Sequence, residues 1–118
     1  KIGVNKMKEC LEKLNKTSGV IGSLIVGRDG LVIDSVVPTY FNADLVGAIV
    51  AGVFTSAESS MEELNQGELD MVMVEGTMGK LILCNSVAIL VVLLGDDVNL
   101  GILRLDIKKT IEDLKQYL

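Results

Sequence analysis

Few residues of this chain could perform chemistry, and their spacing is not typical of an active site. Histidine, the commonest general base and a common metal ligand, is absent. The segment Gly76-Thr77-Met78-Gly79-Lys80 has the glycine–lysine pair of a phosphate-binding loop. Its two glycines are too close together for such a loop, however, and Leu81 stands where serine or threonine is required. We therefore interpret this segment as a turn between two strands.

Two other groups of polar or nucleophilic residues have structural explanations. Asp96 and Asp97 could form a carboxylate pair for a metal, but they precede a predicted helix, where acidic residues favour the helix dipole. Cys10 and Cys84 are unclustered and lie in apolar patterns, which predicts reduced core cysteines of a cytoplasmic protein. The sequence thus predicts no catalytic residue, no metal and no cofactor, and we expect the chain not to be an enzyme.

Size and composition narrow the class of protein further. A chain of 118 residues with 49% hydrophobic residues suits a single globular domain over residues 1–118. Its net charge of −5 and 3% aromatic content argue against nucleic acid as a partner and against an anionic membrane surface. The longest apolar runs, residues 45–54 and 87–94, are much shorter than the roughly 20 residues that span a bilayer. We expect no membrane insertion, and no signal-peptide pattern opens the sequence.

Residues 19–37 predict a β-hairpin around which the remaining elements are arranged. Two apolar, β-branched runs flank Gly27-Arg28-Asp29-Gly30, and Asp-Gly is typical of a tight primed turn. In the first run, both alternating sets of residues are apolar. The sets are Val20, Leu24 and Val26 on one side and Ile21 and Ile25 on the other. A strand that is apolar on both faces is covered on both faces, so we expect helices above and below the sheet.

The remaining segments supply three helices and three more strands. Helical spacing of Val4, Met7, Leu11 and Leu14 predicts a first helix, and the pattern after Asn99 predicts a last one. We predict three more strands, at residues 69–75, 80–84 and 87–94. The first of them has an acidic residue near each end, which suits the edge of a sheet. The predicted element order is α-β-β-α-β-β-β-α, with a five-stranded antiparallel sheet between helices.

The predicted second helix, residues 42–64, has more apolar surface than one sheet requires. Large apolar residues cover about half of its circumference, and the small residues 47, 48, 51, 52 and 55 lie opposite. This small-residue face could fit the domain's own sheet or a second chain, and we favour the second chain. For Met71 and Met73 on the edge strand, core packing and a binding surface both remain open. The predicted dimer interface comprises Val46, Gly47, Val50, Ala51, Phe54, Thr55, Met71 and Met73.

An acidic cluster follows at the end of the same helix. Glu58, Glu62 and Glu63 could form an ordinary solvated face or a contact patch for a basic partner. We retain them as candidate partner-binding residues, because such charges can steer association.

Several segments together resemble the Roadblock/dynein light-chain family. They are the first helix, GVIGSLIVGRDGLVIDS, the long small-residue helix, GKLIL, and AILVVLLGDDVNLGILRLDIKKTIEDL. The resemblance implies a profilin-like topology with strand order 2-1-5-4-3, the second helix on one face and the other two helices opposite. It also implies homodimers joined through the second helix and the third strand. Such dimers act as non-catalytic regulators or scaffolds of Ras-like small GTPases or motor complexes.

A small-ligand sensor of the PAS or GAF kind is the alternative function. Such a sensor would need a cavity between the sheet and the second helix, lined by converging polar groups. Whether that layer is filled or hollow therefore distinguishes the two functions.

Overall fold

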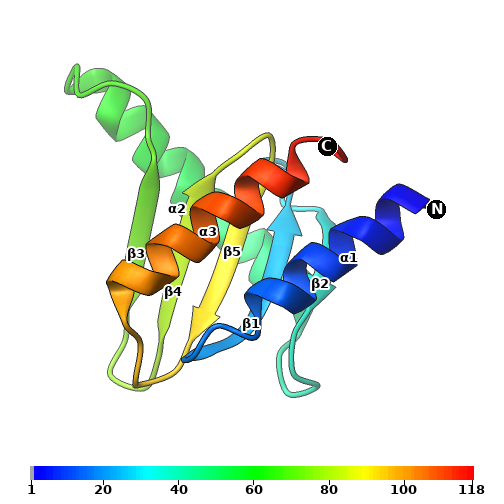
Figure 1. Cartoon of the computed structure of the whole chain (residues 1–118). Helices are drawn as coiled ribbons and strands as arrows, with labels where there is room; N and C mark the ends of the chain where they lie inside the picture. The colour runs from blue at the N-terminus through cyan, green and yellow to red at the C-terminus, as the bar shows by residue number, and fades with distance from the viewer. Residues whose placement is uncertain (1) are drawn as a thin grey trace.

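The computed structural model describes residues 2–118, with side chains from residue 6 onward. Its elements follow the predicted order: α1 (Ile2–Leu14), β1 (Val20–Val26), β2 (Val32–Val36), α2 (Ala43–Glu63), β3 (Met71–Glu75), β4 (Lys80–Asn85), β5 (Ile89–Leu94) and α3 (Leu100–Leu114). The strands form one antiparallel sheet in the order β2-β1-β5-β4-β3 (Figure 1). The predicted fold class and strand order are confirmed.

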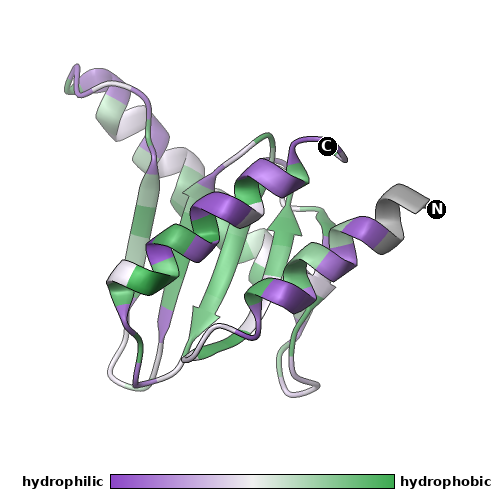
Figure 2. Cartoon of the chain, in the orientation of Figure 1, coloured by the Kyte–Doolittle hydropathy of each residue, from purple (hydrophilic) through white to green (hydrophobic). Residues whose placement is uncertain are grey.

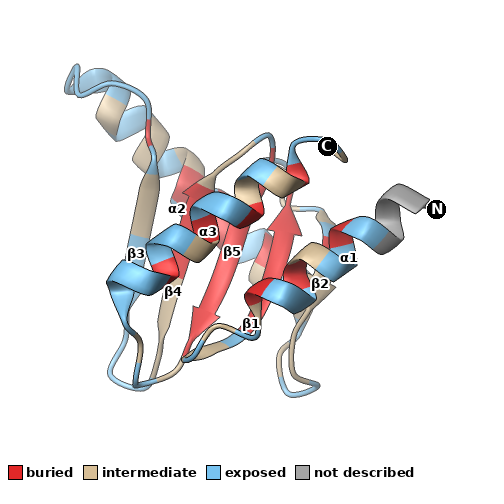
Figure 3. Ribbon diagram, in the orientation of Figure 1, coloured by how far each residue is buried: buried red, intermediate tan, exposed pale blue. Residues whose placement is uncertain are grey.

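The middle of the sheet is covered on both faces, as the apolar pattern of β1 predicts. All six residues of β5 are buried, and so is most of β1 (Figure 3). Leu24 and Val26 face the layer of α2, whereas Ile25 faces the layer of α1 and α3. The alternating direction of side chains along a strand thus gives the domain two cores, one on each side of the sheet.

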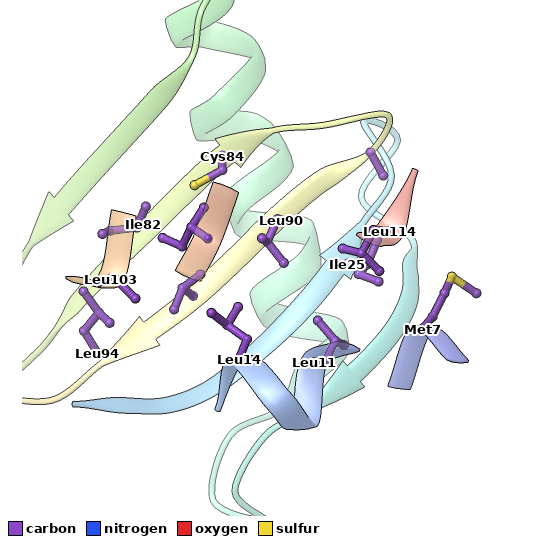
Figure 4. Packing of buried hydrophobic residues seen from close by; sticks show 13 residues of the cluster. Met7, Leu11, Leu14, Ile25, Ile82, Cys84, Leu90, Leu94, Leu103 and Leu114 are labelled. Carbon is purple, nitrogen blue, oxygen red and sulfur yellow. The ribbon is translucent and has the colours of Figure 1, made fainter. Parts of the chain in front are cut away.

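The core beneath α1 and α3 is built from aliphatic side chains on both helices (Figure 4). Met7, Leu11 and Leu14 of α1 are buried there, together with Leu103 and Ile107 of α3. The side chain of Val4, predicted to join this stripe, lies outside the described residues.

The core beneath α2 is filled by large side chains. Phe54 and Val50 are almost completely buried against Leu24, Leu83 and Val91 of the sheet. The C-terminal end of α2 continues beyond the sheet (Figure 1), and hydrophilic residues predominate there (Figure 2). No helix among the described residues combines the length and apolar content needed to cross a membrane.

The turn between β1 and β2 differs from the predicted primed turn. Arg28 and Asp29 keep negative φ angles, and only Gly30 is left-handed, with φ of 89°. The Gly30 amide donates to the Gly27 carbonyl at 2.9 Å, and a register shift follows where Val26 pairs with Val32. A left-handed glycine with a bulge closes a longer hairpin connection without a primed turn.

Candidate protein interface

The rotation of α2 about its axis is fixed by a close contact with the β1–β2 turn. Asn42 caps the helix, its side chain accepting a hydrogen bond from the Leu45 amide at 3.1 Å. A Cβ atom on Gly47 would lie 2.8 Å from Cγ2 of Val32 and 2.9 Å from the Gly30 carbonyl oxygen. Any larger residue at position 47 would therefore push the helix away from the sheet.

This contact bears on the predicted dimer interface. Gly47, Val50, Ala51 and Phe54 are buried in the chain's own core. Little of their surface is left for a second chain, and contact there remains a prediction. The first two turns of α2 fit tightly onto their own hairpin, which was the other explanation for the small residues. Sequence periodicity could not separate the two, because more than half of the helix circumference is apolar or small.

The opposite face of α2 is apolar and open to solvent. Leu45 and Ile49 are 56% and 55% exposed, and Val53 is 38% exposed. Gly52 lies between them, and a Cβ atom there would have no neighbour within 4 Å. The spacing of residues 45, 49 and 53, one every four residues, was the signal for this face. Among the described residues nothing covers it, which makes it a candidate contact surface.

The edge strand β3 also has exposed apolar side chains, one on each face of the sheet. Met73 and Val74 are each 39% exposed, on opposite faces, while Met71 and Val72 are half-buried. Val46 and Thr55, also predicted at the interface, are half-buried on the flanks of α2. For these two residues and the two methionines, contact with a second chain remains a prediction.

At the other edge of the sheet, β2, side chains occupy the backbone groups of one residue. The Ser35 amide donates to Oδ1 of Asp34 at 2.8 Å, and the Ser35 carbonyl accepts from Nζ of Lys8 at 3.1 Å. Lys8 and Asp34 also form an ion pair at 3.0 Å, with the carboxylate almost fully buried. Because the edge-facing groups of Ser35 are occupied, another strand has little to bind here.

The predicted acidic cluster separates into one paired carboxylate and two that form no ion pair within residues 6–118. Glu58 binds the guanidinium of Arg28, with Nη2 to Oε2 at 3.1 Å. The same guanidinium donates to Oδ1 of Asn85 at 2.7 Å and lies 5.5 Å above the ring centre of Phe54. Arg28 therefore links Glu58 of α2 to Asn85, at the turn between β4 and β5.

Glu62 and Glu63 are exposed at the C-terminal end of α2 and are the members of the cluster that are open to a partner. Their role in partner binding remains a prediction.

The remaining candidate groups have structural roles. Residues 76–79 form the β3–β4 turn, closed by a hydrogen bond from the Gly76 amide to the Gly79 carbonyl at 2.8 Å. Asp96 and Asp97 are exposed just before Asn99, whose side chain caps α3. Both cysteines are free. Burial raises the pKa of the Cys84 thiol to about 12, with a smaller contribution from Asp70, which keeps this thiol protonated and unreactive.

Solved structures with the same arrangement include two proteins named MglB and a profilin. MglB of Myxococcus xanthus has a TM-score of 0.87 at 21% identity, and the alignment covers 94% of this chain and 93% of that one. The gliding protein MglB of Thermus thermophilus has a TM-score of 0.86 at 19% identity, covering 99% and 91%. Acanthamoeba castellanii profilin II has a TM-score of 0.59 at 17% identity, covering 93% and 94%. At these identities the likeness establishes the fold, and it confirms the profilin-like topology.

Sequence relatives and the family pattern agree with the fold. The uncharacterized proteins MJ1340 and MJ0310 of Methanocaldococcus jannaschii are 43% and 42% identical to the chain over 106 residues. In both cases the alignment covers 89% of this chain and 93% of the relative. The pattern of the Roadblock/LC7 domain matches residues 6–94. The chain therefore belongs to the Roadblock/LC7 family, as its sequence resemblance predicts.

Proposed function

We propose that this chain is a non-catalytic homodimeric platform for a Ras-like small GTPase. Family membership supports the proposal, because the resemblance to this family implies dimers that regulate or scaffold such GTPases. The observation that carries it is the open apolar surface formed by the outer face of α2 and by β3. Exposed apolar surfaces of this kind are typical of contacts between proteins.

Joining two copies at β3 would cover this surface and extend the sheet from one protomer into the other. Leu45, Ile49, Val53 and Val74 are between 38% and 56% exposed. Burying these four side chains in both copies would contribute about 8 kcal/mol. This takes about 1 kcal/mol per side chain, roughly half the free energy of burying a fully exposed one. Association costs about 4–15 kcal/mol, so the backbone hydrogen bonds of paired β3 strands must also contribute. The occupied edge groups of β2 favour β3 as the joining edge.

Solved structures of similar fold are compatible with self-association. One of them is described as MglB with a tetrameric arrangement, with a TM-score of 0.87 and 18% identity to this chain. That assembly belongs to MglB, and for this chain a dimer is our proposal.

The proposed GTPase contact is the outer surface at the C-terminal ends of the two α2 helices. Glu62 and Glu63 are exposed there and could steer a basic surface of the GTPase. Glu58 contributes less to such steering than the sequence predicts, because Arg28 neutralises it.

A charge reversal tests this contact. We expect Glu62→Lys with Glu63→Lys to slow association with a GTP-loaded Ras-like GTPase of the source cell about tenfold at low salt, with less effect at high salt. Stopped-flow fluorescence measures the rate. Glu9→Lys with Glu12→Lys on α1 is the control, because it changes the net charge equally on the other side of the sheet. If the rate is indifferent to the reversal and to salt, the contact lies elsewhere.

The sensor alternative receives no support from the α2 layer. Phe54 and Val50 fill the space between α2 and the sheet in which such a domain would hold its ligand.

A further inference from the structure

One strand of the sheet is left mostly uncovered on the side of α1 and α3. In Figure 1, α3 runs obliquely over β4 and β5 and α1 runs over β1 and β2, while only the first turn of α3 crosses the end of β3. Met71 and Met73 point to this side, because they pair with Cys84 and Ile82, which belong to the core beneath α3. Met71 is half-buried and Met73 is 39% exposed. The result is a strip of apolar sheet surface next to a helix.

The strip and the helix enclose a groove, which we call the β3–α3 groove. It has a volume of about 420 Å³ and is lined by Asp70, Met71, Cys84, Arg104, Lys108 and Lys115, among others. A second hollow of about 460 Å³ shares Asp70, Met71 and Arg104 with it. This hollow includes Met73 and continues past the β3 edge to Met61 of α2. Methionines are flexible and polarizable, so a surface built on them adapts readily to a partner's apolar side chains.

The α3 wall of this groove is basic. Arg104 and Lys108 are exposed, and neither forms an ion pair with a carboxylate within residues 6–118. Lys115, further along the same wall, is paired with Glu112 at 3.2 Å. Besides this Glu112, the acidic lining residue is Asp70, just before the start of β3. A partner that fits the wall would therefore place its carboxylates along α3.

The dimensions of the proposed dimer suit one helix in this position. Because α3 runs over β4 and β5, the middle of this helix lies about one and a half strand spacings from β3. If β3 pairs with its copy, about four strand spacings, or about 19 Å, separate the two α3 helices. Helices pack at interaxial distances of about 8–10 Å, so a single helix fits between the two α3 helices and rests on the paired β3 strands. Its floor would consist of Met71 and Met73 from both protomers.

We propose that the β3–α3 grooves of a dimer together bind one amphipathic helix of a partner protein. The apolar face of this helix packs on the methionines, and acidic residues on its two flanks bind Arg104 and Lys108 of both protomers. A single helix on the dimer axis requires one bound helix for every two chains. This inference rests on the proposed dimer and adds a second partner surface on the face of the sheet opposite α2.

A designed peptide pair tests the proposal. The probe is a fluorescent helical peptide of about five turns with leucines on one face and glutamates on both flanks. Its twin has lysines in place of the glutamates. We expect the glutamate peptide to bind at least tenfold more tightly than its twin in fluorescence anisotropy, at half a peptide per chain. Arg104→Glu with Lys108→Glu should reverse this preference. Lys13→Glu on α1 with Lys16→Glu in the turn after α1, an equal change of charge, should not.

Light scattering on the same samples separates the two proposals. If the protein is a monomer, the proposed dimer is wrong. The helix site shared between two protomers is then wrong as well, whatever the peptide does. If the protein is a dimer but binds neither peptide, or binds both equally, the helix site is wrong. Binding at one peptide per chain would also overturn it, because an extended strand or a helix on each monomer would then be the occupant.

Discussion

At the scale of single residues, two glycines of α2 have opposite surroundings. Gly47 touches Val32 and the Gly30 carbonyl, whereas Gly52 faces open space. We expect Gly47→Ala to lower the free energy of unfolding by about 1–3 kcal/mol, because the Gly30 backbone cannot move aside. Gly52→Ala, the matched control, should raise it by about 0.5–1 kcal/mol through better helix propensity. Urea unfolding measures both, and equal stability of the two variants would contradict the observed rotation of α2.

Cys84 provides a prediction about pH. Burial raises the pKa of its thiol from 9.0 to about 12 in the folded state. The unfolded chain therefore loses this proton first, and the contribution of Cys84 to stability is complete below pH 9.0 and is lost as the pH rises toward 12. The expected loss is about 1.4 kcal/mol per pH unit in that window.

The comparison with Cys84→Ala isolates this contribution from lysine and tyrosine titration. Denaturant unfolding on both sides of pH 9.0 should show the stability of the wild type falling more steeply than that of the variant. Parallel pH dependences would show that the thiol pKa is not raised.

At the scale of elements, α2 has one face for its own sheet and one that is open. We expect Ile49→Glu to leave the domain folded and to produce monomers, because the charge enters the proposed contact between chains. Ala51→Glu should instead unfold the domain, because Ala51 is buried beneath the helix. Light scattering and far-UV circular dichroism distinguish these results. A monomeric wild type, or an Ile49→Glu dimer of unchanged affinity, would refute the proposed contact.

At the scale of the whole molecule, the two sheet edges differ, and this difference limits assembly. Lys8 and Asp34 occupy the edge-facing groups of Ser35 on β2, whereas β3 is open. Lys8→Ala with Asp34→Val should free the β2 edge and allow species larger than a dimer, which analytical ultracentrifugation detects.

The control for this prediction removes another ion pair of the same helix. Lys6 and Glu9 are 3.5 Å apart and both exposed, so Lys6→Ala with Glu9→Val changes the charge equally without touching β2. We expect this variant to remain a dimer. If the Lys8 and Asp34 variant also stops at two chains, the side chains on β2 do not limit assembly.

The sequence by itself determined the elements, their order and the two-sided core. Ile25 between Leu24 and Val26 shows that β1 is apolar on both faces, and burial on both faces requires helices on both sides. Helix stripes such as Met7, Leu11 and Leu14 are likewise local patterns, because each follows from the geometry of one helix. The family resemblance added the strand order.

Only the tertiary structure decided which surfaces remain open. The rotation of α2 depends on Gly47 meeting Gly30 and Val32, a contact between distant segments that no local period reveals. The pairing of Glu58 with Arg28 and of Asp34 with Lys8 likewise joins residues far apart in the chain. A helix that is apolar around most of its circumference can face either way, and the close fit at one glycine settles its orientation.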